Sequence, residues 1–159
     1  MNQSVSHIVI RRHPYEEPYL TQLEWFVTNG SFSGTTNIFC NVDDIREMGQ
    51  ALSRFPTKLG DEYIYEYGPE KPEVRYCFSL RACTTDAVGH CALQFSINNS
   101  KNISLDGQCS FSIVAEAGAI QRLGSLLRRF GELQHLQLSW TPSESRLFES
   151  YDPLENESE

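Results

Sequence analysis

The sequence predicts an α+β fold, a two-layer domain in which a curved antiparallel sheet of about six or seven strands carries two helices on one face. Segments that alternate apolar and polar residues recur along the chain, and their connections are short and polar. Two other segments carry apolar residues at helical spacing. Nine Phe and seven Tyr against two Met also favour strands, because aromatic side chains suit a pleated, half-buried surface.

The strand candidates are recognised by their alternation. In Leu20–Thr28, for example, Leu23, Trp25 and Val27 share one face. The dipeptide Asn29-Gly30 that follows predicts a hairpin, because both residues accept positive φ. The candidates are His7–Arg12, Leu20–Thr28, Thr35–Val42, Glu62–Tyr67, Glu73–Ala82, Gly89–Asn98, Ile103–Ala115 and His135–Trp140.

Two helices are expected, at Asp43–Phe55 and Ala117–Phe130. Each has one apolar stripe, and each ends at a helix-stopping residue, Pro56 after the first and Gly131 after the second. Charges complement the helix dipoles, with acids in the first turn of one helix and bases in the last turn of the other. The stripes are Ile45, Met48, Ala51, Leu52 and Phe55, and Ile120, Leu123, Leu126, Leu127 and Phe130.

The domain organisation follows from charge and length. The 159 residues suit a single α+β domain over residues 1–140. Residues 141–159 hold six acidic residues against one base, Arg146, and we expect them to form a mobile acidic tail. Leu147, Phe148 and Tyr151 are the residues of this tail that could dock on the domain.

Composition indicates which kind of partner the protein binds and in which cellular compartment it works. The net charge of −8 disfavours a nucleic-acid partner and would steer a basic protein towards the chain. The five cysteines show no CxxC spacing, and no run approaches the ~20 apolar residues of a membrane span. The N-terminal residues also lack a useful apolar stretch, so we expect a cytoplasmic protein with reduced thiols and no membrane contact.

Catalytic patterns are missing from the sequence, and we expect neither an enzyme nor a cofactor. His90 and Cys91 are adjacent, but neighbours in a strand point to opposite faces, so they cannot act as a dyad. A pairing of Cys77 with His90 across neighbouring strands remains as an alternative. The four histidines show no metal-binding spacing, and the acidic pairs Asp43-Asp44 and Asp61-Glu62 fit a helix start and a turn.

Two surfaces are candidates for binding. Tyrosine is enriched at protein interfaces, which favours the segment Asp61, Glu62, Tyr63, Tyr65, Glu66 and Tyr67 as a partner-binding surface. The alternative is that this segment is an edge strand that packs its tyrosines on a helix. The second candidate is a ligand site on the polar face of the sheet, formed by Arg75, Arg81, His90 and Gln94.

Three patterns occur in a recognisable order over roughly residues 20–130. They are the turn with Gly30, Phe32, Ser33 and Gly34, the helix with Asp43, Asp44, Ala51 and Leu52, and the strand opened by Gly89 and His90. This order resembles the WapI-type immunity proteins and related small bacterial families. The resemblance implies a non-catalytic bacterial protein that binds and neutralises a cognate toxin, and it supplies no catalytic residues.

The expected function is therefore binding to a protein, with a basic toxin domain as the partner that the resemblance and the charge favour. Two other functions stay open. One is a small-ligand-binding or substrate-processing domain that uses the polar face of the sheet. The other is a structural module that self-associates into a homodimer through exposed sheet edges.

Overall fold

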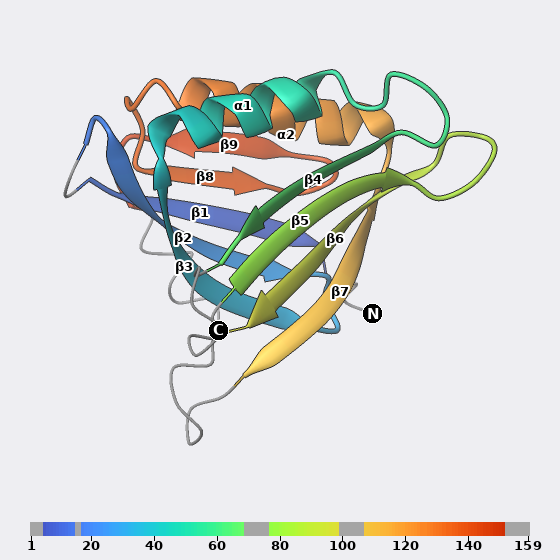
Figure 1. The fold of residues 1–159 in the computed structure, drawn as a ribbon, viewed down its shortest axis with the longest axis horizontal. Helices are drawn as coiled ribbons and strands as arrows, with labels where there is room; N and C mark the ends of the chain where they lie inside the picture. The colour runs from blue at the N-terminus through green and yellow to red at the C-terminus, as the bar shows by residue number, and fades with distance from the viewer. Residues whose placement is uncertain (1–4, 15–16, 69–76, 99–106, 152–159) are drawn as a thin grey trace.

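The computed structural model describes residues 5–14, 17–68, 77–98 and 107–151 (Figure 1). In chain order these residues form β1 (His7–His13), β2 (Leu20–Thr28), β3 (Ser33–Asn41), α1 (Val42–Ser53), β4 (Glu62–Tyr67), β5 (Cys77–Thr84), β6 (Cys91–Asn98), β7 (Gln108–Ala115), α2 (Ala117–Phe130), β8 (Gln137–Trp140) and β9 (Ser145–Phe148). The predicted α+β class with antiparallel strands is confirmed. Residues 73–76 and 103–106, which begin two of the expected strands, lie outside the described residues.

The strands form two sheets, so the prediction of a single sheet was wrong. The five-stranded sheet has the order β3-β2-β1-β8-β9, and the four-stranded sheet has the order β4-β5-β6-β7. Helix α1 separates two runs of consecutive strands, and each run pairs within itself. Strand β4 therefore starts a second sheet instead of extending the first. Alternation of polarity marks a strand and its two faces, but it does not specify the neighbouring strand.

The N-terminal strand is joined to the C-terminal part of the chain. β1 pairs with β2 on one side and with β8 on the other, where Ile8 lies opposite Trp140. The two sheets are also linked at their edges, because the side chain of Asn29 in the β2–β3 turn donates to the carbonyl of Ser112 in β7 at 3.1 Å. The turn is held by the Asn29 side-chain oxygen, which accepts from the backbone N–H groups of Ser31 and Phe32.

Both helices lie side by side at the top of the view in Figure 1. Helix α1 begins after Asn41 with Asp43 and Asp44 in its first turn, and α2 ends with Arg128 and Arg129 in its last turn. These charges lie at the helix ends where the dipole favours them. The predicted apolar stripes are confirmed in large part, because each helix buries its own stripe against the sheets and the other helix.

The helices cross at two glycines. An added Cβ at Gly124 of α2 would lie 2.2 Å from the backbone nitrogen of Ser53, and one at Gly49 of α1 would lie 2.6 Å from the backbone nitrogen of Arg128. Both distances are far below van der Waals contact. The two helix backbones thus touch directly, and only glycine fits on either side of this contact.

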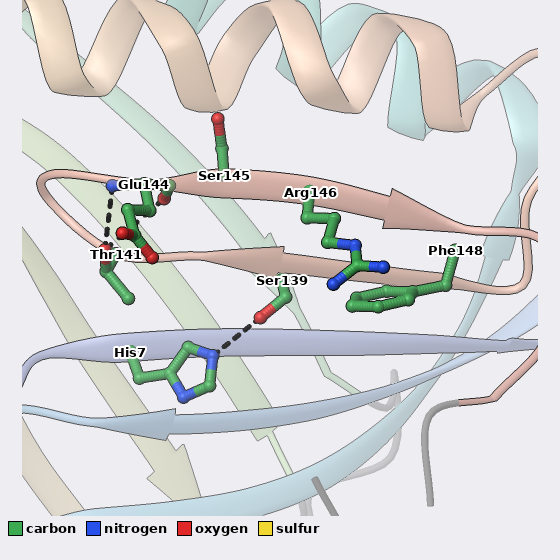
Figure 2. Close-up of a pocket in the computed structure, with 7 residues that line it drawn as sticks. All are labelled: His7, Ser139, Thr141, Glu144, Ser145, Arg146 and Phe148. Atoms are coloured by element: carbon green, nitrogen blue, oxygen red, sulfur yellow. Dashed lines mark hydrogen bonds between the residues drawn. The ribbon is translucent and has the colours of Figure 1, made fainter. Parts of the chain in front are cut away.

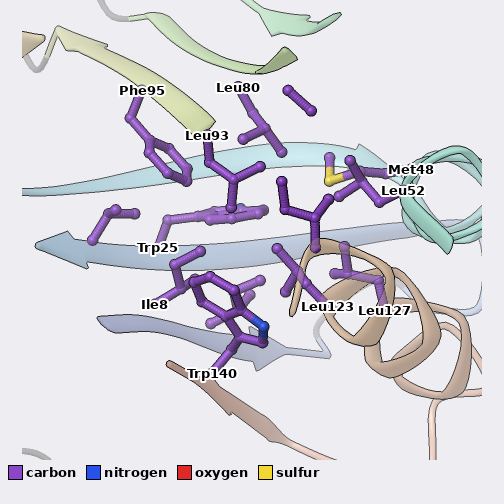
Figure 3. Packing of buried hydrophobic residues seen from close by; sticks show 14 of the residues in the cluster. Ile8, Trp25, Met48, Leu52, Leu80, Leu93, Phe95, Leu123, Leu127 and Trp140 are labelled. Carbon is purple, nitrogen blue, oxygen red and sulfur yellow. The ribbon is translucent and has the colours of Figure 1, made fainter. Parts of the chain in front are cut away.

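The hydrophobic core lies between the two sheets and the helices (Figure 3). Trp25 of the five-stranded sheet meets Phe78 of the four-stranded sheet, with ring centroids 4.8 Å apart. Phe78, Phe95 and Phe111 then form a row across the four-stranded sheet at centroid distances of 6.2 and 6.1 Å. Aromatic contacts of this kind add to the free energy gained by burying the rings themselves. One continuous core therefore holds the two sheets together.

The C-terminal segment belongs in part to the fold. Residues Ser145–Phe148, which the sequence placed in a mobile tail, form β9 and pair with β8. Leu147 packs against the core, and the hydroxyl of Tyr151 donates to the carbonyl of Arg12 at 2.6 Å. The segment is ordered despite its acidic composition because its apolar residues pack on the domain. Residues 152–159 lie outside the described part of the chain.

None of the helices in the described part of the chain is long and apolar enough to cross a membrane.

Candidate functional site

The acidic segment predicted to bind a partner is β4, an edge strand of the four-stranded sheet. Its side chains divide as alternation requires. Tyr63, Tyr65 and Tyr67 are half-buried and pack against the core, while Glu62 and Glu66 are exposed. The structure therefore places the tyrosines where the alternative interpretation put them, as an edge strand packed inward. The exposed surface of β4 consists of the two acids and Ile64.

The environment of Tyr63 and Tyr65 keeps both side chains neutral. Burial is the main cause that raises the pKa of Tyr63 to about 12, and the carboxylates of Glu47 and Asp44 add to it. Burial also raises the pKa of Tyr65, with smaller contributions from Cys40 and Asp44. The pKa of the neighbouring Cys40 thiol rises to about 12, mainly because the thiol is buried. These groups therefore keep their protons near neutral pH and are poorly placed for acid–base or nucleophilic chemistry.

The reactivity of each thiol should follow its exposure to solvent. Cys77 is exposed, whereas Cys40, Cys83 and Cys91 are buried. We expect a thiol-specific chromogenic reagent to modify Cys77 in the native protein and to reach the three buried thiols only after unfolding. The Cys77→Ser variant should lose the rapid phase of labelling and keep only the slower reaction of Cys109, which is half-buried. A rapid phase that persists in this variant, traced by mass spectrometry to a buried thiol, would contradict the structure.

Two residues of the predicted ligand site contact each other on the polar face of the four-stranded sheet. Arg81 donates through Nε to Glu62 at 2.5 Å and through Nη1 to the side-chain oxygen of Gln94 at 2.6 Å. The contact with Glu62 is the main cause that raises the pKa of Arg81. The guanidinium is thus already satisfied by its neighbours. Arg75, the third predicted residue of this face, lies outside the described residues.

His90 lies apart from that face, in the connection between β5 and β6. Its Nδ1 is 2.5 Å from the Oδ2 atom of Asp86, and Gly89 before it has φ of 94°. Cys77 is paired with Asn98, at the far end of the same strands. The alternative pairing of Cys77 with His90 is therefore wrong. Cys91 is fully buried, as the strand interpretation predicted.

The pair of Asp86 and His90 should give this turn a pH dependence. The hydrogen bond to Asp86, followed by its charge, raises the pKa of His90 above 6.5, and the hydrogen bond to His90 is the main cause that lowers the pKa of Asp86 below 3.8. The stability from His90 is present below pH 6.5 and is lost as pH rises through its raised pKa. The stability from Asp86 is present above pH 3.8 and is lost as pH falls through its lowered pKa.

We expect the Asp86→Asn substitution to move the pKa of His90 back towards 6.5 in an NMR titration of the imidazole signals. The neighbouring substitution Asp61→Asn is a matched control, because Asp61 holds a different turn through Thr57. A His90 titration that is the same in Asp86→Asn and in the unmodified protein would refute the pairing.

The outer face of the five-stranded sheet carries the exposed aromatic residues that sequence reasoning did not select. Phe26 of β2 and Phe39 of β3 are 37% and 58% exposed, although both lie in regular strands. Arg11 of β1 points to the same side, where its register partner is Glu24. We call the surface formed by Arg11, Glu24, Phe26, Phe39 and Tyr151 the aromatic face. The sequence signal was available, because both phenylalanines occupy polar positions of their alternating strands.

Tyr151 returns across this face from the C-terminal segment. Its ring lies 5.9 Å from the Arg11 guanidinium carbon and 5.6 Å from the His13 ring. The hydroxyl is also 3.2 Å from Nδ1 of His13. An aromatic ring held beside a guanidinium is a stabilising arrangement, and here it fixes the C-terminal segment against β1.

A hollow of about 500 Å³ opens beside the aromatic face, over β1, β8 and the β8–β9 turn (Figure 2). The Nε2 atom of His7 is 2.7 Å from the Ser139 hydroxyl, and the guanidinium of Arg146 lies 4.5 Å from the centre of the Phe148 ring. The residues that line the hollow are His7, Ser139, Thr141, Glu144, Ser145, Arg146 and Phe148. The sequence pointed to none of these as a site, because they meet only through the pairing of the two chain ends.

Within the described ranges, no group of three or more His, Cys, Asp or Glu side chains could hold a metal ion.

Comparisons with known proteins show little similarity. No family model matches this sequence, and no curated protein matches it. Among solved structures, one titled "Structure of the plant transcriptional regulator PBF-2" resembles this chain with a TM-score of 0.47 and 11% sequence identity, over 82% of this chain and 78% of that chain. A likeness at this level carries no argument about function.

Proposed function

We propose that this protein works by binding another protein, without catalysis, through its aromatic face. Exposed Phe26 and Phe39 are the observation that supports this, because regular strands normally turn such residues towards the core. Aromatic residues and arginine are enriched at protein interfaces, where they carry much of the binding free energy. The aromatic face presents both kinds of residue on one side of a sheet that the core holds rigid.

The partner that we propose is a basic toxin domain. The resemblance to WapI-type immunity proteins implies a toxin, and the net charge of −8 would speed the encounter with a basic domain. Glu66, exposed on β4, is placed to contribute to this field from outside the interface. The five free thiols suit a reducing compartment, so we propose that the binding takes place in the cytoplasm.

The test is co-expression of this protein with the toxin encoded beside its gene, scored as cell growth and as co-purification of the two proteins. We expect protection by the unmodified protein and its loss in the Phe26→Ser/Phe39→Ser variant. The matched control is Val114→Ser, which replaces a similarly exposed apolar residue, 75% exposed, on the four-stranded sheet. The variant Glu66→Lys should slow association and keep most of the affinity.

Each other outcome contradicts part of the proposal. If the product of the neighbouring gene is harmless, the proposed toxin partner is wrong. If Val114→Ser loses protection as fully as the double variant, the aromatic face is not the binding surface. Sedimentation that shows a homodimer disrupted by the double substitution would assign the face to self-association instead. Aromatic and basic side chains on a sheet can also bind single-stranded nucleic acid. Salt-sensitive binding of an oligonucleotide that the double substitution abolishes would therefore also refute the proposal.

A further inference from the structure

The hollow beside β9 holds two opposite charges that do not neutralise each other. Glu144 and Arg146 are two residues apart and both line the hollow. Within the described residues, neither forms an ion pair with the other or with any further side chain. Figure 2 shows the Glu144 carboxylate and the Arg146 guanidinium apart, with the Ser139 hydroxyl between them in this view.

The backbone that carries both charges is held in place by the local structure. The hydroxyl of Thr141 accepts from the backbone N–H of Glu144 at 2.9 Å, and the Thr141 N–H donates to the Glu144 carbonyl at 2.7 Å. The Phe148 ring supports the Arg146 guanidinium from below. Helix α2 fixes the same turn, because Arg122 donates to the Thr141 carbonyl at 2.6 Å. Both charged side chains therefore project from the β8–β9 hairpin, whose turn is fixed to helix α2.

We infer that this hollow is a binding site for a small zwitterion of the amino-acid class. The carboxylate of the ligand would accept from Arg146, whose planar guanidinium suits a two-oxygen anion. Its ammonium group would donate to Glu144, which is free to accept. A volume of about 500 Å³ suits a single small molecule, and the Phe148 ring adds apolar surface for the body of the ligand. The site does not depend on the protein partner proposed above.

A simple anion fits the same residues less well. Glu144 would repel it across the hollow, just as Arg146 would repel a simple cation. A ligand that carries both charges turns each of these repulsions into an attraction. Each charge-assisted contact should strengthen binding by roughly a factor of ten or more.

Three probes separate these contributions in NMR titrations of the backbone amide signals. L-Phenylalanine carries both charges, 3-phenylpropionate lacks the ammonium group, and phenethylamine lacks the carboxylate. We expect shifts centred on β8, β9 and the start of β1, with L-phenylalanine binding about tenfold more tightly than either of the other two. The aromatic ring common to all three keeps the apolar contact constant.

Two exposed side chains supply the variants. Glu144→Gln should remove the advantage of L-phenylalanine over 3-phenylpropionate, and Arg146→Gln should remove its advantage over phenethylamine. The controls Glu66→Gln and Arg46→Gln, at exposed positions on other elements, should change neither preference.

The alternatives have distinct signatures in the same experiment. Equal binding of the three probes would mean apolar adsorption to Phe148 only, and it would overturn the inference. An advantage of L-phenylalanine over 3-phenylpropionate that survives Glu144→Gln would overturn it as well. So would the absence of shifts at millimolar concentrations of every probe. None of these readouts involves the toxin, so failure here and failure of the proposed function can be told apart.

Discussion

Replacing Gly124 by alanine is expected to destabilise the protein by about 3 kcal/mol or more. The new Cβ would lie 2.2 Å from the nitrogen of Ser53 and 2.6 Å from the carbonyl carbon of Leu52. These are backbone atoms of α1, so no side-chain rotation can relieve the clash. The helices would have to separate, which would loosen the core beneath them. For a chain of this size the melting temperature should fall by roughly 6–12 °C in a calorimetric scan.

The control lies in the same helix. Nothing lies within 4 Å of an added Cβ at Gly118, in the first turn of α2. Alanine is the better helix former, so Gly118→Ala should leave the melting temperature unchanged or raise it slightly. Equal melting temperatures of Gly124→Ala and Gly118→Ala would show that the helices do not cross as closely as described.

Removing the charge of Glu17 is expected to cost about 3 kcal/mol of stability. Arg12 is buried, with a side chain 5% exposed, and its Nη1 donates to Glu17, whose side chain is 12% exposed. The same guanidinium donates through Nε to the carbonyl of His135 at 2.9 Å. In Glu17→Gln the shape is kept, but a buried guanidinium loses its counter-charge. Unfolding in urea, with the midpoint and slope both measured, should show the loss as a lower midpoint.

An exposed ion pair of the same kind provides the comparison. Arg46 and Asp43 are 3.2 Å apart on α1, with side chains 53% and 79% exposed. Asp43→Asn should change stability by less than about 0.5 kcal/mol, because solvent screens such pairs. If Glu17→Gln were as mild as Asp43→Asn, the Arg12 network would have no structural importance.

Local structure was predictable from the sequence, and the arrangement of the sheets was not. The strands and helices follow from periodicity, because burial of one face forces alternation in a strand and a stripe in a helix. Trp25, for example, was expected on a buried face and is fully buried. The pairing of β1 with β8 joins residues more than a hundred positions apart, and no local pattern encodes it. The glycines at the helix crossing were also missed, because a close approach leaves no periodic signal.

The candidate sites were predicted in part. Arg81 and Gln94 do meet on the polar face, because they are register partners on adjacent strands. The tyrosines of β4 were ambiguous, since either face of an edge strand can be the buried one. The aromatic face and the hollow depend on which strand ends adjoin and on the return of Tyr151. Both are set by tertiary contacts that a single sequence does not reveal.

The position of β1 in the middle of its sheet has a consequence for synthesis on the ribosome. One edge of β1 pairs with β2 as soon as both have emerged, but the other edge waits for β8, near the end of the chain. Until then the nascent chain exposes an unpaired edge that includes Ile8 and Ile10, and such edges invite association between chains. Release of a chain stalled before Trp140 would thus yield an aggregation-prone fragment, and completion of the last strands protects the first.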